Sequence, residues 1–425
     1  MAARSAAPAG CTASPARLLA RELVAEARVR DAYVRELVDA RRGEVAAGRI
    51  SQADFDFAQV LAFGVTMCAG TLDELIDRNL SSPRDVRAKL RDALRISAYE
   101  LLFLGKPEHV AVSQGVELAR SVQPRAAGLA NAVLRKMARD ARAFPWGDAR
   151  TDDAALARAG GVPLWLAQRL AGQYGREGAE RLLAACLRPA PTYLVANPFA
   201  PAQSFAADLS SQQTAAFVPL GGSLLEVGAG RGTKTLLLQC RSLQELGRCS
   251  SIHTVDVHAY KQRLLAERMR ELGIAGVCAH VGDGRQLGAI EGLPASFDAA
   301  FVDAPCSGTG TMRRHPEMRW RLGPADVEEL AGLQFELLCA AAARVRRGGT
   351  LVYATCSLLA EENEHVVERF LASSAGEGYE PDSLRPEELL DGQDPAALTS
   401  AGHFASLPRE GGPDGHFAAR FTRVR

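Results

Sequence analysis

The chain has 425 residues, which is too long for one ordinary domain and predicts two or three. Hydrophobic residues make up 47% and charged residues 24%, and no apolar run approaches the roughly 18–20 residues that span a bilayer, so we expect a soluble protein without membrane partners. The net charge is zero, but residues 1–150 carry 23 basic against 18 acidic side chains. A basic N-terminal part is compatible with a polyanionic partner, although charge runs are usually solvated helix faces.

Nine cysteines occur without a C-x-x-C pair or a Cys/His cluster at zinc-ligand spacing. This predicts free thiols in a reducing cytoplasm and no resident metal. Residues 1–15 are rich in Ala, Pro and Ser and lack an apolar core segment, so we expect a disordered tail rather than a signal peptide.

Residues 16–144 show apolar positions at spacings of three and four between short breakers, which predicts an all-α helical bundle. Three phrases, LRISAYELLFL, HVAV and AGLANAVLRK, resemble in order and spacing the NusB-like RNA-binding domain. That domain is known from antitermination factors and from one rRNA methyltransferase family. The resemblance implies RNA binding and places Asn131 and Arg135 on a helix near the interface with a catalytic domain, with Arg135 as an RNA-binding candidate.

Residues 145–200 read as a connector with short helices. From residue 201 to 425, short β-rich runs alternate with helical stretches, beginning with SLLEV and TKTLLLQCRSL. This alternation predicts an α/β doubly wound, Rossmann-like domain whose ligands bind beyond the carboxyl ends of the strands. The closing segment around Asp414 and Phe417 is expected to add an antiparallel strand at one edge.

After the first of these strands comes a glycine-rich loop, EVGAGRGTKT. Its glycines allow a sharp turn and close approach to a ligand. The loop resembles the cofactor loop of class I methyltransferases, which implies S-adenosylmethionine, whereas the plainer interpretation is a tight strand–helix turn. Acids that end the following strands, Asp256 and Asp283, can accept from ribose hydroxyls and an adenine amino group. The cofactor candidates are Glu226, Gly228, Ala229, Gly230, Arg231, Gly232, Thr233, Lys234, Asp256, Asp283 and Asp303.

Two later strands end in cysteines, Cys306 in DAPCSGTGTMRRHPE and Cys356 in ATCSLLAEENE. A thiolate that adds to carbon 6 of cytosine activates carbon 5 for methylation, Asp303 can stabilise the developing charge, and a second thiol can assist release. The chemistry alone leaves open which cysteine attacks. Both motifs together resemble the RNA cytosine-C5 methyltransferase family that includes bacterial Sun/Fmu proteins. In that family the cysteine matching Cys356 is the nucleophile, and the one matching Cys306 assists product release.

Between these cysteines, positive charge is interleaved with an aromatic residue. Such side chains can clamp phosphates and stack a base, whereas a solvated basic loop is the alternative. The RNA-binding candidates of this segment are Arg313, Arg314, His315, Arg319 and Trp320.

With a NusB-like part in front, the resemblance implies a bacterial enzyme, expected to be a monomer, that methylates 16S rRNA. Two departures stand against it. The cofactor loop differs from the family's usual D-x-C-A-A-P-G-G-K-T, and only ten residues separate Asn197 from Asp208, too few for the family's small RNA-binding subdomain. A tRNA-directed enzyme of the same chemistry, or an RNA-binding regulator with a degenerate methyltransferase half, therefore remain alternatives.

Overall fold

The computed structural model describes residues 13–425, so residues 1–12 of the expected tail lie outside the described residues. The chain divides into two compact units. Unit 1 contains the chain up to Pro189 together with Met312–Arg321, and unit 2 contains Ala190–Thr311 and Leu322–Arg425. Residues 312–321, which follow the first cysteine motif, thus cluster with the helical unit.

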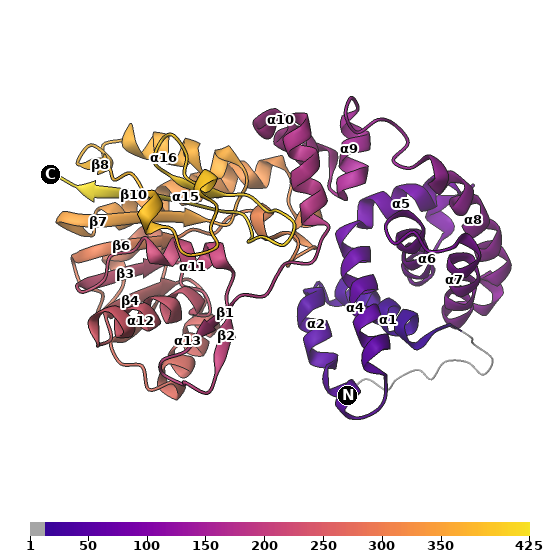
Figure 1. Cartoon of the computed structure of the whole chain (residues 1–425), viewed down its shortest axis with the longest axis horizontal. Helices are drawn as coiled ribbons and strands as arrows, with labels where there is room; N and C mark the ends of the chain where they lie inside the picture. Colours follow the sequence, from indigo (N-terminus) through magenta and orange to yellow (C-terminus); the bar gives the residue numbers. More distant parts are fainter. Residues whose placement is uncertain (1–12) are drawn as a thin grey trace. The chain divides into compact units, whose positions relative to one another are not determined.

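Unit 1 is helical, as the sequence predicts (Figure 1). Its first helix starts where Ser14 accepts a hydrogen bond from the Arg17 amide and Pro15 occupies the first turn, a favourable start for a helix. Buried Leu, Ala and Val side chains of the longer helices form one core. The helices are α1 (Pro15–Arg30), α2 (Val34–Arg41), α3 (Gly43–Ala46), α4 (Gln52–Met67), α5 (Ala69–Arg78), α6 (Ala88–Leu102), α7 (Glu108–Val122), α8 (Ala127–Asp140), α9 (Asp153–Gly160), α10 (Leu164–Cys186) and α14 (Met318–Arg321).

One predicted helical stretch is broken in the structure. The apolar run of residues 57–80 is divided at Cys68 into α4 and α5, which are bent by 78°. The break frees the Met67 carbonyl, which accepts a hydrogen bond of 3.1 Å from the Trp320 indole. Within residues 13–425, no single helix is long and apolar enough to cross a membrane, and only this bent pair passes by length and composition.

Helices α9 and α10 lie in the predicted connector and belong to unit 1. Gly175 interrupts α10 with a φ of 71° and a ψ of 162°, so the long helix consists of two short ones, as the sequence predicts.

Unit 2 is built on a sheet with the strand order β5-β4-β3-β6-β7-β10-β8, and β9 pairs with β10. Strands β3 to β7 are parallel to their neighbours within that set, whereas β10 runs antiparallel to β7, β8 and β9. The predicted closing strand is therefore antiparallel, but β8 covers its outer side. The strands are β3 (Ser223–Val227), β4 (Ser251–Asp256), β5 (Val277–Val281), β6 (Phe297–Asp303), β7 (Val345–Thr355), β8 (Tyr379–Pro381), β9 (Phe404–Ser406) and β10 (His416–Arg423).

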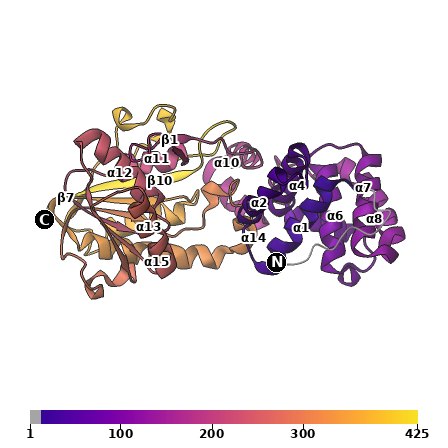
Figure 2. The same ribbon diagram turned by 90° about the horizontal axis from the view of Figure 1, so that it is seen from below.

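Helices cover both faces of this sheet, as Figures 1 and 2 show. Because side chains alternate along a strand, Leu225 and Val227 of β3 pack with the helix that carries Leu338, and Leu224 packs with the one that carries Leu237. The central strands are consequently apolar on both sides, which is typical of a doubly wound fold. The helices of unit 2 are α11 (Leu209–Ala216), α12 (Thr233–Leu246), α13 (Ala259–Glu271), α15 (Pro324–Ala342) and α16 (Glu364–Leu371).

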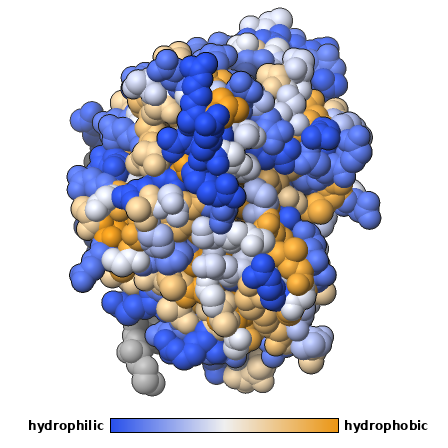
Figure 3. Space-filling model, turned by 90° about the vertical axis from the view of Figure 1, so that its left-hand side faces the viewer, coloured by the Kyte–Doolittle hydropathy of each residue, from blue (hydrophilic) through white to orange (hydrophobic). Residues whose placement is uncertain are grey.

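A small antiparallel hairpin fills the short interval that the sequence analysis noted. Strand β1 (Leu194–Ala196) pairs with β2 (Ser204–Ala206), and Asp208 then caps α11 by accepting from the Ser210 amide. On the face drawn in Figure 3, hydrophobic side chains form small separate patches among hydrophilic ones.

Candidate active site

The residues that the sequence predicts for catalysis and cofactor binding lie at the carboxyl ends of four adjacent strands of unit 2. Strands β4 and β6 flank β3 on opposite sides, so the chain reverses its direction of sheet growth there, which is where open α/β sheets bind ligands. The glycine loop follows β3, Asp256 ends β4, Asp303 ends β6 and Cys356 follows β7. The topology therefore brings together residues that are up to 130 positions apart in the sequence.

The glycine loop adopts a backbone that only glycine tolerates easily. Gly228, Gly230 and Gly232 have φ values of 85°, 56° and 80°. A Cβ at Gly228 would lie 2.1 Å from the backbone oxygen of Asp303, so a side chain there would displace the end of β6. Of the other loop candidates, Ala229 is buried, and Arg231 and Thr233 are exposed at the start of α12.

Asp256 is hydrogen-bonded to the glycine loop. Its two carboxylate oxygens accept from the amides of Gly230, at 3.1 Å, and His258, at 2.8 Å. Asp283, which follows β5, is paired with Arg285 at 2.6 Å, and hydrogen bonds from that side chain and its amide lower the pKa of Asp283. Both acids lie where the sequence predicts, at consecutive strand ends.

Glu226 lies beneath the loop and is completely buried. One carboxylate oxygen accepts from the Thr235 hydroxyl at 2.7 Å, and within the described residues the other oxygen has no hydrogen-bond partner. Burial raises the pKa of Glu226 to about 7. An unpartnered buried acceptor beside a glycine loop fits a ligand that carries a cationic amino group, as S-adenosylmethionine does.

Cys306 and Cys356 are in contact, with their sulfur atoms 3.2 Å apart. Both are partly exposed and carry free thiols, so a substrate can reach them. The hydrogen bond to Cys356 and burial raise the pKa of Cys306 well above its usual value. The hydrogen bond from Cys306 lowers the pKa of Cys356, and the nearby Lys234 ammonium lowers it further against the effect of burial. The thiolate is thus favoured on Cys356.

A helix N-terminus does not supply that preference. Helix α16 starts only at Glu364, and a short 3₁₀ turn at Ala360–Glu362 precedes it. The neighbouring thiol and Lys234 favour the thiolate instead.

Lys234 forms an ion pair with Asp303 at the end of β6. Burial alone would lower the pKa of Lys234, but Asp303 and the two thiols outweigh it, so the pKa is raised and the ammonium stays charged. The sequence analysis assigned Lys234 only to the cofactor loop. Its partnership with Asp303 requires the spatial pairing of α12 with β6, which no motif spacing reveals.

The basic segment after Cys306 is largely buried in unit 1. Arg319 is 1% exposed and donates to the carbonyls of Gly160, Gly161 and Cys186 at 3.0, 3.2 and 2.6 Å. With no surface left for a phosphate, the prediction that Arg319 contacts RNA is not supported. The Trp320 indole is likewise engaged by the Met67 carbonyl.

The remaining residues of that segment are also placed against unit 1. Arg313 is 3% exposed, and Arg314 and His315 are half-buried. The His315 ring lies edge-on to Tyr33, with 5.8 Å between the ring centroids. Arg314 and His315 remain candidates for RNA contact, whereas Arg313, like Arg319, has almost no exposed surface for a phosphate. The segment as a whole is not a solvated loop.

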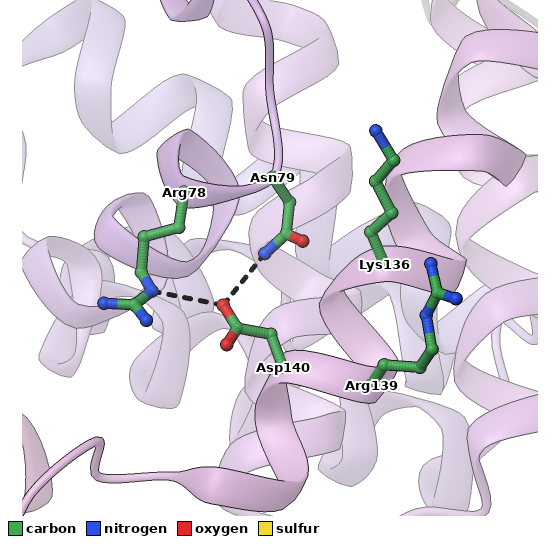
Figure 4. Close-up of a pocket in the computed structure, with 5 residues that line it drawn as sticks. All are labelled: Arg78, Asn79, Lys136, Arg139 and Asp140. Carbon is green, nitrogen blue, oxygen red and sulfur yellow. Dashed lines mark hydrogen bonds and ion pairs between the residues drawn. The ribbon is translucent and has the colours of Figure 1, made fainter.

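Arg135 lies on the exposed face of α8 and donates to Asn131 at 3.2 Å, one turn away. The next turn of α8 contributes to an open pocket of about 590 Å³, which we call the basic pocket, lined by Arg78, Asn79, Lys136, Arg139 and Asp140 (Figure 4). Arg78 and Asn79 both donate to Asp140 at 3.1 Å, whereas Lys136 and Arg139 are exposed and have no ion-pair partner in the part of the chain that the structure describes. The pocket carries three cations and one acid.

Across residues 13–425, no group of three or more His, Cys, Asp or Glu side chains is arranged to hold a metal ion.

Known proteins match both units. A family model described as 16S rRNA methyltransferase RsmB/F matches residues 220–422, and one described as the NusB family matches residues 14–139. A ribosomal RNA small subunit methyltransferase B of Thermus thermophilus is 31% identical over 399 residues, covering 88% of this chain and 90% of the relative. A putative methyltransferase of Mycobacterium tuberculosis is 33% identical over 486 aligned positions, covering both chains completely.

Solved structures share the fold. The crystal structure of PH0851 covers 97% of this chain and 99% of its own, with a TM-score of 0.72 and 20% identity. A methyltransferase homolog protein from Pyrococcus horikoshii covers 65% of this chain and all of its own, with a TM-score of 0.50 and 20% identity. At these identities the likeness concerns the fold alone, and it agrees with the Rossmann-like unit that the sequence predicts.

Proposed function

Because this chain belongs to the RsmB/F family of 16S rRNA methyltransferases, we propose that it methylates carbon 5 of a cytosine in 16S rRNA through a covalent bond between Cys356 and carbon 6 of the base. The observation that carries this proposal is the contact of two free thiols, 3.2 Å apart, at strand ends beside the Lys234–Asp303 ion pair. Carbon-5 methylation of cytosine requires a nucleophile for carbon 6 and a base for the carbon-5 proton, and two adjacent sulfur atoms can serve in these roles as thiolates.

The cofactor would be held by the glycine loop and the acids around it. Gly228 allows the loop to approach the end of β6 closely, and Glu226 offers the unpartnered oxygen. Asp256 holds the loop at the end of β4, where it could also accept from a ribose hydroxyl. When bound there, S-adenosylmethionine supplies an electrophilic methyl group. The donor set fits this ligand although the loop departs from the family's usual sequence.

Cys356 is the attacking group in this mechanism. Its thiolate forms a bond to carbon 6 of the cytosine, and the electron pair of the carbon 5–carbon 6 double bond moves into the ring, which makes carbon 5 nucleophilic. The pKa of Cys356 is lowered by the hydrogen bond from Cys306 and by the Lys234 charge, which favours this thiolate over that of Cys306.

Asp303 and Lys234 stabilise the ring while its charge changes. The Asp303 carboxylate can accept from the exocyclic amino group, and the Lys234 ammonium offsets negative charge that develops on the ring. Because each holds the other in place, neither group has to reorganise when the base arrives.

Cys306 completes the reaction. After carbon 5 has gained its methyl group, its proton must leave so that the electron pair can expel Cys356 as a thiolate. Cys306 lies within hydrogen-bond distance of Cys356. Once Cys306 has released its own proton to solvent, its thiolate can remove the carbon-5 proton directly or through water. The released enzyme then carries one thiol and one thiolate, as before.

RNA contacts outside the active site are proposed for α8. Lys136 and Arg139 of the basic pocket, with Arg135 one turn away, present positive charge on a unit that matches the NusB family. Such side chains bind the phosphate backbone without regard to sequence. The curated relatives named ribosomal RNA small subunit methyltransferase B support 16S rRNA as the substrate.

Bisulfite sequencing of rRNA and tRNA from a strain that lacks this protein tests the proposal. We expect one cytosine of 16S rRNA to lose its methyl mark and to regain it when the gene is restored. Loss of a mark from tRNA instead would transfer the same chemistry to another substrate. Unchanged marks in both RNAs would reject the enzymatic proposal.

A further inference from the structure

A buried carboxylate, Glu362, lies behind the two cysteines. It is completely buried and belongs to the short 3₁₀ turn that precedes α16. Its carboxylate accepts from the amide and hydroxyl of Ser307, the hydroxyl of Ser357 and the side-chain amide of Gln334, at 2.5 to 3.0 Å. An acid just before a helix commonly faces solvent and complements the helix dipole, but Glu362 is enclosed by the two cysteine loops instead.

The two serines are the residues directly after the two cysteines. Ser307 follows Cys306 on the loop after β6, and Ser357 follows Cys356 on the loop after β7. Their hydroxyl oxygens are 3.2 Å apart, and each lies within 3.3 Å of the Thr309 hydroxyl. One carboxylate therefore joins the two loops at positions adjacent to the reacting sulfur atoms.

The surrounding contacts brace the same two loops. The Gln334 amide that reaches Glu362 also donates to the Pro305 carbonyl at 2.9 Å, and the Tyr353 hydroxyl donates to the Glu362 carbonyl at 2.6 Å. Gly310 donates its amide to the Cys356 carbonyl at 2.9 Å. The loops are thus held by side chains and by backbone, and Glu362 is the only carboxylate among these described contacts.

The donors around Glu362 suit a carboxylate. An ionised carboxylate accepts through about four lone-pair positions and donates nothing, which matches the four hydrogen bonds that it receives. One oxygen accepts from the Ser307 and Gln334 amides, and the other accepts from the Ser307 and Ser357 hydroxyls. A glutamine can keep its oxygen toward the two amides, but its NH₂ group then faces the two hydroxyls, which no longer find an acceptor there. The hydroxyls would have to turn away, so the tie between the two loops is weakened.

We propose that Glu362 is a positioning residue that sets the spacing of Cys306 and Cys356 by tying Ser307 to Ser357. This inference rests on the proposed function for its meaning, since the spacing matters because both thiols act on one base. Its physical content, a sulfur–sulfur distance fixed by a buried carboxylate, holds in the free protein.

Disulfide formation measures that spacing without RNA or cofactor. Diamide oxidises two neighbouring thiols to a disulfide: the sulfur–sulfur bond forms, two protons and two electrons leave the thiols, and the azo bond is reduced to a hydrazine. The Cys306–Cys356 cross-link is followed by peptide mass spectrometry in the full-length chain. We expect Glu362→Gln to slow its formation by about tenfold or more, and to lower kcat by about 100-fold with a smaller change in KM for RNA.

Val366→Ala is the matched control. Val366 is a buried core residue of α16 that makes none of these hydrogen bonds, so its truncation lowers stability while leaving the thiols in place. Its cross-linking rate should stay within about twofold of the wild type at temperatures where both variants are folded. Slow cross-linking in this control as well would assign the effect to general destabilisation and overturn the proposal.

Ser307→Ala with Ser357→Ala provides a second route if Glu362→Gln does not fold. This pair removes the hydroxyls that the carboxylate joins and should also slow cross-linking. A wild-type rate in folded Glu362→Gln, or in the serine pair, would overturn the inference. If cross-linking slows as expected but the wild type transfers no methyl group to RNA, the proposed function fails and the positioning role stands.

Discussion

The sulfur atoms of Cys306 and Cys356 lie 3.2 Å apart although fifty residues separate them in the chain. At this distance one proton can be shared, and the two environments are unequal. Lys234 favours the negative charge on Cys356, while burial and the Glu362 charge oppose it on Cys306. The same contact therefore gives the two thiols different tasks.

Substituting each cysteine separately should have opposite effects on covalent trapping. Cys306→Ala removes the group that assists release, so a protein–RNA adduct that resists denaturant should accumulate. Cys356→Ala removes the attacking sulfur and should form none. Denaturing gel electrophoresis with labelled RNA and S-adenosylmethionine distinguishes them, and the reverse pattern would exchange the two roles.

Lys234→Gln should slow the reaction and move its pH dependence. Cys306, Lys234 and Asp303 are the ionisable groups that act on Cys356, and of these Lys234 contributes a positive charge that lowers its pKa. Without that charge the pKa of Cys356 rises, so thiolate formation shifts to higher pH and kcat at neutral pH falls by about 100-fold. The pH profile of Cys356 alkylation by iodoacetamide provides the measurement, and an unshifted profile would contradict the role of Lys234.

Glu226→Gln should alter how stability depends on pH. The folded pKa of about 7 exceeds the unfolded value of 4.5, so this carboxyl contributes stability below 4.5 that is lost as the pH rises to 7. The glutamine variant lacks that loss. Relative to wild type, its free energy of unfolding should therefore rise by about 2.5 kcal/mol between pH 5 and pH 8. Urea denaturation without ligand measures this, and a constant difference would count against it.

Reversing charge in the basic pocket should weaken RNA binding. In Lys136→Glu with Arg139→Glu, two phosphate contacts are lost, so affinity should fall and the slope of log affinity against log salt should decrease by about two. Filter binding at several salt concentrations measures both. Arg49→Glu, an exposed reversal between α3 and α4, is the charge control. An equal loss in that control would assign the effect to net charge alone.

Arg319→Met should destabilise unit 1. Arg319 donates to three buried carbonyls, and their loss of partners costs about 3 kcal/mol in the free energy of unfolding. Lysine cannot reproduce the planar fork, so Arg319→Lys should rescue little. Arg321→Met, at an exposed ion pair with Asp31, should cost less than about 1 kcal/mol. Thermal unfolding compares the three, and equal effects would remove the special role of Arg319.

The sequence alone placed the strand-end residues well and the buried ones poorly. The glycine loop, Asp256, Asp303 and the cysteine motifs could be placed because a strand-helix alternation puts strand ends along one edge of a sheet. The sequence around Arg319 and Trp320 resembles an RNA-binding loop. No neighbouring residue in the sequence indicates that the Arg319 guanidinium donates to carbonyls of α9 and α10.

The buried position of Glu362 could not be predicted from the sequence either. An acid just before a helix is common, and only the meeting of two distant loops makes it a buried acceptor. At the break between α4 and α5, the Met67 carbonyl likewise accepts a hydrogen bond from Trp320, which lies some 250 residues away and could not be paired with it from the sequence.

Residues Met312–Arg321 belong to unit 1, although the residues on both sides of them in the sequence belong to unit 2. The polypeptide passes between the two units at Pro189, at Thr311 and at Arg321, so no single cut separates them. A fragment that ends at Pro189 lacks Arg319 and Trp320, which fill the interior of unit 1, and leaves the carbonyls of Met67 and Cys186 without their donors. A fragment that starts at Ala190 carries Arg319 and Trp320 without the carbonyls of unit 1 that accept their hydrogen bonds. We therefore expect the fragment that ends at Pro189 to be less stable than the same unit in the intact chain, because a stretch that is synthesised only after Cys306 completes its interior.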